Sequence, residues 1–565
     1  MNRRTFVNTS LLAFSALPFR NIDFSMVNKP SWILEWIKIH DIQLASYQKY
    51  KVTQKENKYF GGYMDDAELP NPHSTAGFIG KSCMLWTCEE SVFYQQPALL
   101  PDIELALISL LKMQHADGTI DLLSTNFHST PDTAFALENI IPAYRFISAY
   151  NNPIASKVQN LLKQFIIQAG EALTVGGIHT PNHRWVVCAS LTRINELFPN
   201  EKYIKRINQW LAEHIDLDPD GQYTEKSTNG YSPIVNRSLI IMADGLNKPE
   251  LLEAVKKNLI MTFYYVHPNG EVVTEASNRQ DKGTIGNMHK YYDVYRYMAL
   301  KFQDGTMASM CRLIEKTSTP EQLARFLDSF LEDPGLWQEL PSSKPLPTQY
   351  SREFPYSGVV RIRRENWDCT ILSNNTSWLT FHKGNAVLQA MRIATSFFGK
   401  GQFQTAKIKA VDKNWVLQNS LEGPYYQPLD ADKISPDGDL DKMPRTLRLQ
   451  SEVQKLNYLV KVTELPTGVE VDFDISGTDG VPVSLELIFR PGGIFTGVSP
   501  IPNIKDAYLF PSSNGSYTVG NDKITFSPGL MLHKGVQLRG ALPAMESPTV
   551  YLTGITPFKH KITLS

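Results

Sequence analysis

The feature that most constrains the fold is a break in the helical pattern that recurs through residues 31–335. Glycine-containing turns stand at 61–62, 117–118, 176–177, 220–221 and 269–270, at intervals of 44 to 59 residues. Turns at such regular intervals mark a repeated supersecondary unit. The first part of the chain is therefore expected to stack several copies of one unit.

Each break is preceded by an amphipathic helical segment and followed by a helical segment that carries few charges. The charged segments are residues 32–50, 101–115, 154–173, 201–215 and 248–265, and the charge-poor ones are 75–88, 132–144, 182–197, 232–246 and 288–300. An exposed helix needs a charged face and a buried helix does not. The unit is therefore an outer helix, a loop and an inner helix.

Five such hairpins, or six if residues 319–332 form another, are expected to make an (α/α) toroid. A solenoid is the alternative, because closure cannot be read from the sequence. In either arrangement the loops after the outer helices lie on one rim. The inner helices begin there, and their free backbone N–H groups favour anions.

After residue 341 the sequence changes to short, alternating, β-branched segments separated by Gly, Pro, Asn and Asp. Many short strands with tight turns predict an antiparallel β-sandwich. The strands expected are residues 358–364, 370–373, 378–382, 456–464, 469–475, 483–489 and 549–555. The chain thus reads as multidomain α+β, with a toroid over 30–337, a Pro- and Ser-rich linker over 338–349 and a β-sandwich over 350–565.

The net charge of -1 gives no bulk attraction to nucleic acid or to an anionic membrane surface. No later segment approaches the length of a membrane span. Residues 1–25 resemble an export signal, because Arg3 and Arg4 precede a mostly apolar run over 6–17. An exported, periplasmic protein is expected.

Polar side chains are concentrated in four of the rim loops. They are Asn126, His128 and Asp132; His179, Asn182, His183, Arg184 and Trp185; Tyr223, Glu225, Lys226, Asn229, Tyr231, Asn236 and Arg237; and Glu275, Asn278, Arg279, Asn287, His289, Tyr291 and Tyr292. Some of the Asn and Asp residues are also well placed as helix caps. Arginines suit anion binding, and the aromatic residues suit stacking on sugar faces, so the rim is the candidate binding site.

Other kinds of site are less well supported. The His and Asp spacings are irregular and predict no transition-metal site, so no metal or other cofactor is expected. Asp65, Asp66 and Glu68 offer oxygen ligands for a structural calcium ion, although an acidic surface turn is the favoured explanation. A glycoside hydrolase is the serious rival, with Glu225 paired to Asp132 or Glu275 as acid and base.

Two stretches resemble a known family. D-G-Q-Y-T-E-K-S-T-N-G-Y (220–231) is similar to the D-G-x-x-x-E-x-S-x-x-Y-H stretch of heparinase II/III-like proteins, and N-H-R-W-V-V-C-A-S-L (182–191) resembles their asparagine-bearing helix. One extra residue separates Ser227 from Tyr231, and Ser232 stands where a histidine is common. The resemblance implies a heparinase II/III-like or alginate lyase-like polysaccharide lyase, built as a toroid followed by a β-sandwich, with the toroid over 30–337 as the catalytic domain.

Such a lyase would cleave a bond 4-linked to a uronic acid by β-elimination and leave a 4,5-unsaturated uronate. Its substrate would be a uronic-acid-containing polysaccharide or oligosaccharide, and an exo-acting rhamnose–glucuronate lyase acting on arabinogalactan is one form to consider. The C-5 proton can be removed only when donors neutralise the uronate carboxylate. The reaction also needs a base at C-5 and an acid at the leaving oxygen.

The resemblance assigns Tyr231 as the acid, and Asn182, with Arg184 or His183, to the carboxylate. The base is His183 or His289 if elimination is anti, whereas Tyr231 serves both roles if it is syn. As a base, Tyr231 needs nearby cations, for which Lys226, Arg237 and Arg279 are the candidates. The further substrate-binding residues expected are Arg184, Trp185, His128, Asn126, Glu225, Arg237, Arg279 and Tyr292, and His382 is a candidate wall residue from the β-sandwich. A non-catalytic glycan-binding protein is the third hypothesis.

Overall fold

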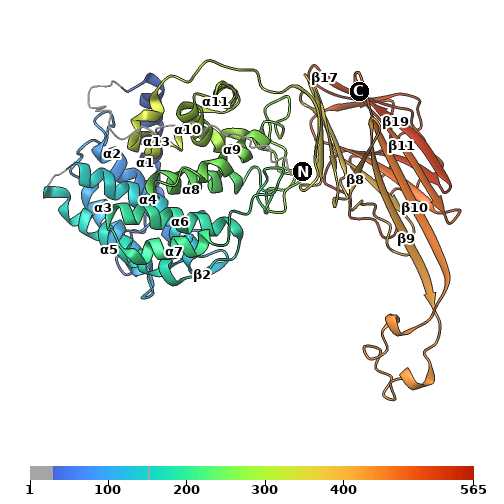
Figure 1. The fold of residues 1–565 in the computed structure, drawn as a ribbon, viewed down its shortest axis with the longest axis horizontal. Coiled ribbons are helices and arrows are strands. Elements are labelled where there is room, and N and C mark those ends of the chain that lie inside the picture. Colours follow the sequence, from blue (N-terminus) through green and yellow to red (C-terminus); the bar gives the residue numbers. More distant parts are fainter. Residues whose placement is uncertain (1–28, 151–152) are drawn as a thin grey trace, which may run out of the picture. The chain divides into compact units, whose positions relative to one another are not determined.

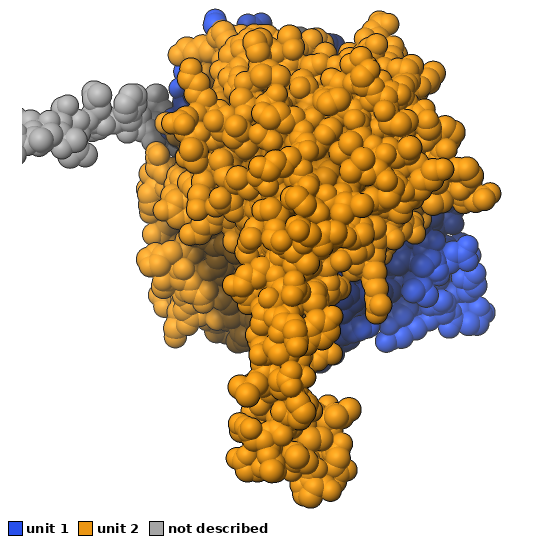
Figure 2. All heavy atoms as spheres, turned by 90° about the vertical axis from the view of Figure 1, so that its right-hand side faces the viewer, with its two compact units in different colours: residues 1–172, 299–304, 319–342 blue, residues 173–298, 305–318, 343–565 orange. Residues whose placement is uncertain are grey.

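The computed structural model describes residues 29–150 and 153–565, and in it the helices precede most of the strands (Figure 1). The export signal predicted over residues 1–25 lies outside these described residues. Within them, every helix is too short or too polar to cross a membrane. The chain divides into two compact units, coloured in Figure 2: Met1–Ala172, Ala299–Asp304 and Thr319–Ser342 form the first, and Leu173–Met298, Gly305–Ser318 and Ser343–Ser565 form the second.

The predicted alternation of outer and inner helices is confirmed. The outer helices are α1 (Ser31–Ser46), α3 (Leu99–Met113), α5 (Ser156–Val175), α7 (Glu201–Leu211) and α9 (Leu251–Thr262). The inner helices are α2 (Pro72–Thr87), α4 (Thr130–Ala149), α6 (Pro181–Leu197), α8 (Ser232–Gly245) and α10 (Tyr292–Phe302). Burial follows the charge pattern, since α7 buries only Tyr203 and Ile207 whereas α6 is buried along most of its length.

The helical region is closed rather than open-ended. Inner helix α2 packs on α4, and α6 packs on α8, while α3, α7 and α9 cover α2, α6 and α8 respectively. Within the first unit, α1 contacts both α12 (Pro320–Ala324) and α13 (Leu327–Glu332), so the end of the helical region meets its beginning. This contact selects the toroid over the solenoid. The expected helix over 319–332 is two short helices, and α11 (Gly305–Thr317) was not predicted.

Two of the repeated glycines, Gly118 and Gly221, let their loops pass close to the next outer helix. Gly118 has φ +86°, and a Cβ there would lie 2.1 Å from the backbone oxygen of Gln168 on α5. Gly221 has φ +96°, and its Cβ would lie 2.8 Å from the backbone oxygen of Lys257 on α9. A positive φ and the absence of a side chain are both required at these positions. The repeat in the sequence therefore records a repeated contact between a loop and a helix.

Replacing Gly118 with alanine is expected to lower the free energy of unfolding by about 2–5 kcal/mol, because left-handed backbone strain and overpacking against backbone atoms add together. Urea unfolding measures this change. Gly177→Ala is the matched control, since a Cβ there would meet nothing within 4 Å. Equal losses of stability in the two variants would contradict the packing explanation.

The predicted antiparallel β-sandwich is present in the second unit. One sheet has the strand order β13-β16-β17-β19-β11-β10-β9-β8 and the other β14-β15-β18-β12-β7-β6-β5-β4-β3, with a single parallel pair, β15 and β18. The strands are β3 (Gln349–Phe354), β4 (Val359–Arg364), β5 (Trp367–Leu372), β6 (Leu379–Lys383), β7 (Ala386–Thr395), β8 (Ile408–Val411), β9 (Asn414–Tyr426), β10 (Gln450–Leu465), β11 (Gly468–Gly477), β12 (Pro482–Phe489), β13 (Ile494–Thr496), β14 (Ser499–Pro500), β15 (Ala507–Leu509), β16 (Gly515–Val519), β17 (Asp522–Ser527), β18 (Thr549–Ile555) and β19 (Phe558–Leu564). All seven strands expected from the sequence are among them. Their apolar side chains fill the core between the two sheets.

A smaller core joins the loop after α9 to the sheet within the second unit. Tyr265 and Val273 from that loop pack with Phe354, Val359 and Leu372 of β3, β4 and β5, and all five side chains are buried. This packing fixes one end of the loop that runs from residue 266 to residue 287. The same loop carries several of the predicted site residues.

Candidate active site

Tyr231 is the residue immediately before α8, and Pro233 lies in the first turn of that helix. Its backbone N–H donates to the Oγ of fully buried Ser227 at 3.0 Å, which fixes the residue at the start of the helix. The side chain is half-buried, and its phenol oxygen lies 3.4 Å from Oε1 of Gln280. The phenol is therefore not enclosed in the packed core.

Arg279 connects Tyr231 to a buried carboxylate. The guanidinium carbon of Arg279 lies 5.3 Å from the centre of the Tyr231 ring, within the range of a cation–π interaction. Its Nε lies 3.3 Å from Oε1 of Glu225. One arginine from the loop after α9 thus contacts two residues from the loop before α8.

Glu225 in turn holds Asn182, at the start of α6. The amide Nδ2 of Asn182 donates to Oε2 of Glu225 at 2.7 Å, and the Asn182 backbone N–H donates to the same oxygen at 3.3 Å. The side-chain oxygen of Asn182 is buried without a hydrogen-bond partner among the described residues. The contacts Asn182–Glu225–Arg279–Tyr231 bring together the two stretches that carry the family resemblance.

The carboxyl of Glu225 has an altered proton affinity. Burial raises its pKa, and the hydrogen bond from Asn182 and the charge of Arg279 only partly oppose that effect. A buried carboxyl whose pKa is shifted by named neighbours marks a candidate functional position. Glu225 is therefore a candidate proton-exchanging group, and its hydrogen bonds anchor Asn182.

Arg184 and Trp185 do not have the positions that the sequence predicted for them. Arg184 is buried, and its guanidinium bonds to Glu213 at 3.1 Å and to Asp216 at 3.0 Å. Trp185 has no exposed surface, and its indole N–H donates to Asp216 at 3.0 Å. Both side chains point from the first turn of α6 into the protein, so neither presents a donor or a flat face to a sugar.

Three further rim residues also have structural partners. Arg237 forms an ion pair with Asp293, and its NH2 lies 3.0 Å from Oδ1 of that residue. Tyr292 is 2 % exposed and donates to Glu315 at 2.7 Å. Lys226 donates to the backbone oxygen of Ser357 at 2.9 Å. Of the three cations considered as partners of Tyr231, Arg279 contacts its ring.

The two histidines considered as the base, His183 and His289, are both half-buried at helix starts. The backbone N–H of His183 donates to the oxygen of Thr180 at 3.1 Å, in the first turn of α6. The Nδ1 of His289 forms a short hydrogen bond with Asn287 at the start of a 3-10 helix (Met288–Tyr291). The next residue, Lys290, donates to the backbone oxygen of Asn229 at 2.9 Å, which places this helix beside the loop that carries Tyr231.

Asn126 and His128 belong to the first compact unit, on a short hairpin of β1 (Ile120–Leu122) and β2 (Asn126–Ser129). Nδ2 of Asn126 donates to Asp132 at 3.0 Å. His128 is exposed, stacks on His115 and pairs with Asp117 at 2.8 Å. Both therefore stabilise the hairpin that precedes α4.

Gln280 was not singled out from the sequence. It follows Arg279 directly, and its contact with the phenol of Tyr231 is the only signal that identifies it.

Asp65, considered for calcium, accepts the backbone N–H groups of Ala67 and Leu69 at 3.0 and 3.1 Å and the amide of Asn71 at 3.0 Å. These bonds explain the acidic turn at residues 65–68 as a local loop structure.

No family model matches the sequence, and no curated protein matches it. Solved structures do match. Heparinase III has a TM-score of 0.54 at 11% identity over 98% of this chain and 87% of that chain. A Paenibacillus xanthan lyase has a TM-score of 0.59 at 8% identity over 96% and 57% of the two chains. The chondroitin AC lyase of Streptomyces coelicolor A3 has a TM-score of 0.54 at 12% identity over 94% and 79%. The chain therefore has the fold of these polysaccharide lyases, a helical toroid followed by a β-sandwich.

Proposed function

We propose that this protein is a polysaccharide lyase that cleaves a bond 4-linked to a uronic acid by β-elimination. The observation that carries the proposal is the contact chain Asn182–Glu225–Arg279–Tyr231, which places an amide, a cation and a phenol together. The likeness in fold to heparinase III, a xanthan lyase and a chondroitin AC lyase supports it. Export to the periplasm is part of the same proposal, because such substrates lie outside the cytoplasm.

The uronate carboxylate would be neutralised by Arg279 and Asn182. Removing a proton next to a carboxylate builds up a second negative charge, and fixed donors stabilise it without rearranging during the reaction. In the free protein the amide of Asn182 and the guanidinium of Arg279 both face Glu225. A raised pKa allows Glu225 to take up a proton, which would release both donors for the substrate carboxylate.

Tyr231 would then transfer the proton to the leaving O-4. Its phenol is the one group in this contact chain that can donate a proton and is only half-buried. For syn elimination, the same oxygen would first take the C-5 proton, and the cation of Arg279 beside the ring would stabilise the phenolate. For anti elimination, His183 or His289 would be the base.

A glycoside hydrolase is the second candidate, because Glu225 has the buried, raised-pKa carboxyl that suits a general acid. Asp132 and Glu275, the carboxylates expected to pair with Glu225 in a hydrolase, hydrogen-bond to other residues. Asp132 accepts the hydroxyl of Ser129 and the amide of Asn126. Glu275 accepts the backbone N–H of Thr274 at 3.0 Å. The lyase assignment uses all four residues of the contact chain, whereas the hydrolase assignment uses one.

Incubation with defined uronic-acid glycans tests the proposal. The panel includes heparin-, chondroitin-, alginate- and xanthan-type chains and rhamnose-capped arabinogalactan. Elimination creates a double bond conjugated to the carboxylate, so at least one substrate should give a product with new ultraviolet absorbance. Cleavage without that absorbance would favour the hydrolase, and binding without any product would favour a glycan-binding protein.

A further inference from the structure

Strands β9 and β10 continue beyond the sheet to which they belong. β8 pairs with β9 over residues 414–417, and β11 pairs with β10 over residues 456–465. Further out, β9 and β10 pair with each other as far as Tyr426 and Gln450. This two-stranded ribbon and the connection at its end, together residues 418–455, are called the arm, which projects from the bottom of the sandwich in Figure 1 and Figure 2.

The arm has little core of its own. An isolated two-stranded ribbon is at best marginally stable in water. The connection, residues 427–449, forms two short 3-10 helices, Ala431–Lys433 and Arg445–Leu447, and Leu429 and Ser435 are its only buried residues. The apolar core between the two sheets takes no side chain from residues 422–455. The outer part of the arm therefore needs packing from outside itself.

Large apolar side chains on the arm are exposed. They are Tyr425, Tyr426, Ile434, Leu440, Leu447 and Leu449, and each is between 38 % and 73 % exposed. Phe398, from the loop after β7, adds its ring to this surface, with its centre 5.5 Å from that of Tyr425. Exposed apolar groups gathered on one segment mark a surface that binds a partner.

The charges of the connection are divided between two halves. Residues 430–441, the acidic half, contain five aspartates and one lysine. Residues 442–449, the basic half, contain one lysine and two arginines and no acidic residue. Charges of one sign gathered in one place attract a surface of the opposite sign. The arm therefore offers a partner one negative and one positive surface, side by side in the sequence.

Ion pairs within the connection neutralise part of these charges. Both lysines pair with aspartates of the acidic half, at 2.7 Å. Among the described residues, four charges of the connection have no ion pair: Asp432 and Asp441 in the acidic half, and Arg445 and Arg448 in the basic half. The guanidinium of Arg445 lies over the ring of Tyr426 instead, 5.8 Å from its centre. Each half thus keeps charges of its own sign for a partner.

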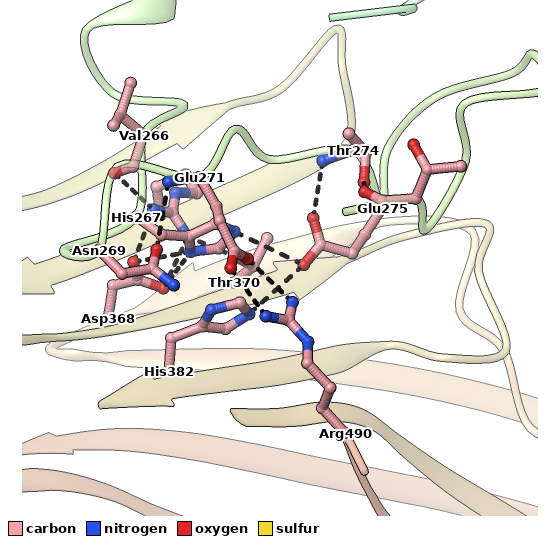
Figure 3. Close-up of polar contacts among 12 residues, drawn as sticks. Val266, His267, Asn269, Glu271, Thr274, Glu275, Asp368, Thr370, His382 and Arg490 are labelled. Atoms are coloured by element: carbon pink, nitrogen blue, oxygen red, sulfur yellow. Dashed lines mark hydrogen bonds and ion pairs between the residues drawn. The ribbon is translucent and has the colours of Figure 1, made fainter. Parts of the chain in front are cut away.

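Charged groups that join segments elsewhere in the second unit have partners inside the chain. Arg490, just after β12, donates to both oxygens of Glu271, at 2.8 and 2.9 Å (Figure 3). Nδ1 of His267 lies 2.9 Å from an oxygen of Asp368 in the same view. The arm differs from these contacts, because its four remaining charges have no counter-charge within one chain.

We propose that the arm forms the interface of a homodimer, by packing against the arm of a second copy of this chain. In an interface with two-fold symmetry the same surface of each copy meets the other, so that surface must be complementary to itself. Two arms in antiparallel orientation meet this condition, because the acidic half of each then faces the basic half of the other. The exposed apolar side chains are buried between them.

The charge pattern favours a second copy over other partners. An anionic glycan or a nucleic acid would be attracted by the basic half and repelled by the acidic half. A second arm matches both halves at once. This inference goes beyond the proposed function and stands whether or not the protein is a lyase.

Sedimentation velocity of the full-length protein at low ionic strength tests the proposal. The wild-type protein should sediment with twice the mass of one chain. Asp432→Lys/Asp441→Lys sets lysines opposite the arginines of the second copy, and Arg445→Glu/Arg448→Glu sets glutamates opposite its aspartates. Each double variant should raise the dissociation constant of its dimer at least about 100-fold, because like charges then meet across the interface.

An equimolar mixture of the two double variants should restore dimers. Opposite charges face each other when a dimer contains one copy of each variant, and native mass spectrometry identifies such mixed dimers. Lys409→Glu/Lys413→Glu is the matched control, because both lysines are exposed, one on β8 and one in the turn between β8 and β9, at the other end of β9 from the arm. This control variant should remain dimeric.

Hydrogen–deuterium exchange of the wild-type protein provides a second measurement in case the variants do not fold. Exchange of the backbone amides of residues 427–449 should slow as the protein concentration is raised, because mass action favours the dimer. Wild-type protein that stays monomeric would overturn the proposal. Double variants that both remain dimeric, or folded variants that form no mixed dimer, would do the same.

Discussion

Replacing Tyr231 with phenylalanine is expected to reduce kcat/KM on the best glycan by about 100- to 10,000-fold, the usual contribution of a proton-transferring side chain. The substitution removes only the phenol oxygen, which contacts Oε1 of Gln280 at 3.4 Å. The ring beneath Arg279 and the backbone bond to Ser227 both remain. Stability should therefore be unchanged, and the loss should come from proton transfer alone. Initial rates of ultraviolet absorbance measure it.

Tyr297→Phe is the matched control for this experiment. Tyr297 donates to Asp244 near the end of α8, so it lies at the opposite end of the helix from Tyr231. A helix of that length separates the two sites by roughly 20 Å. Tyr297→Phe should keep full activity. If Tyr231→Phe also keeps most of its activity while Glu225→Gln loses it, the hydrolase assignment would replace the lyase assignment.

The fold was largely readable from the sequence because its signals are local. Helical amphipathicity and glycine turns each span less than one repeat, so five hairpins could be recognised without any tertiary information. Helix α11 was not predicted because only two residues separate it from α10. The glycine-containing turn that marks each repeat is absent between these two helices. Closure of the toroid depends on contacts of α1 with α12 and α13, which lie nearly three hundred residues apart and leave no mark on the sequence.

The candidate site was only partly readable, because residue type does not determine which way a side chain points. Asn182 and Arg184 stand two positions apart in the first turn of α6. The side chain of Asn182 faces Glu225, whereas that of Arg184 points inward and forms an ion pair with Asp216. The sequence grouped them because both are polar residues at a helix start. The two side chains point apart because Asp216 pairs with Arg184, and no sequence pattern connects Asp216 with either residue.

Replacing Asp368 with asparagine is expected to lower the free energy of unfolding by about 3–5 kcal/mol, because it leaves a buried cation without its partner. The Arg361 side chain has no exposed surface, and its contacts with Asp368 are two hydrogen bonds of 3.0 and 3.1 Å. Asparagine preserves the size of the side chain but not the charge. Urea unfolding followed by tryptophan fluorescence measures the change.

Asp430→Asn makes the same substitution in an exposed ion pair, with Lys433 at 2.7 Å, and should leave the urea midpoint unchanged. The pH dependence identifies the cause of the loss in Asp368→Asn. Because the pKa of Asp368 is held far below its usual range, its contribution is complete above the unfolded pKa of about 4 and is lost only as the pH falls below that value. The difference between wild type and Asp368→Asn should therefore be constant from pH 5 to pH 8 and shrink in acid. A difference that persists undiminished in acid would attribute the loss to packing rather than to charge.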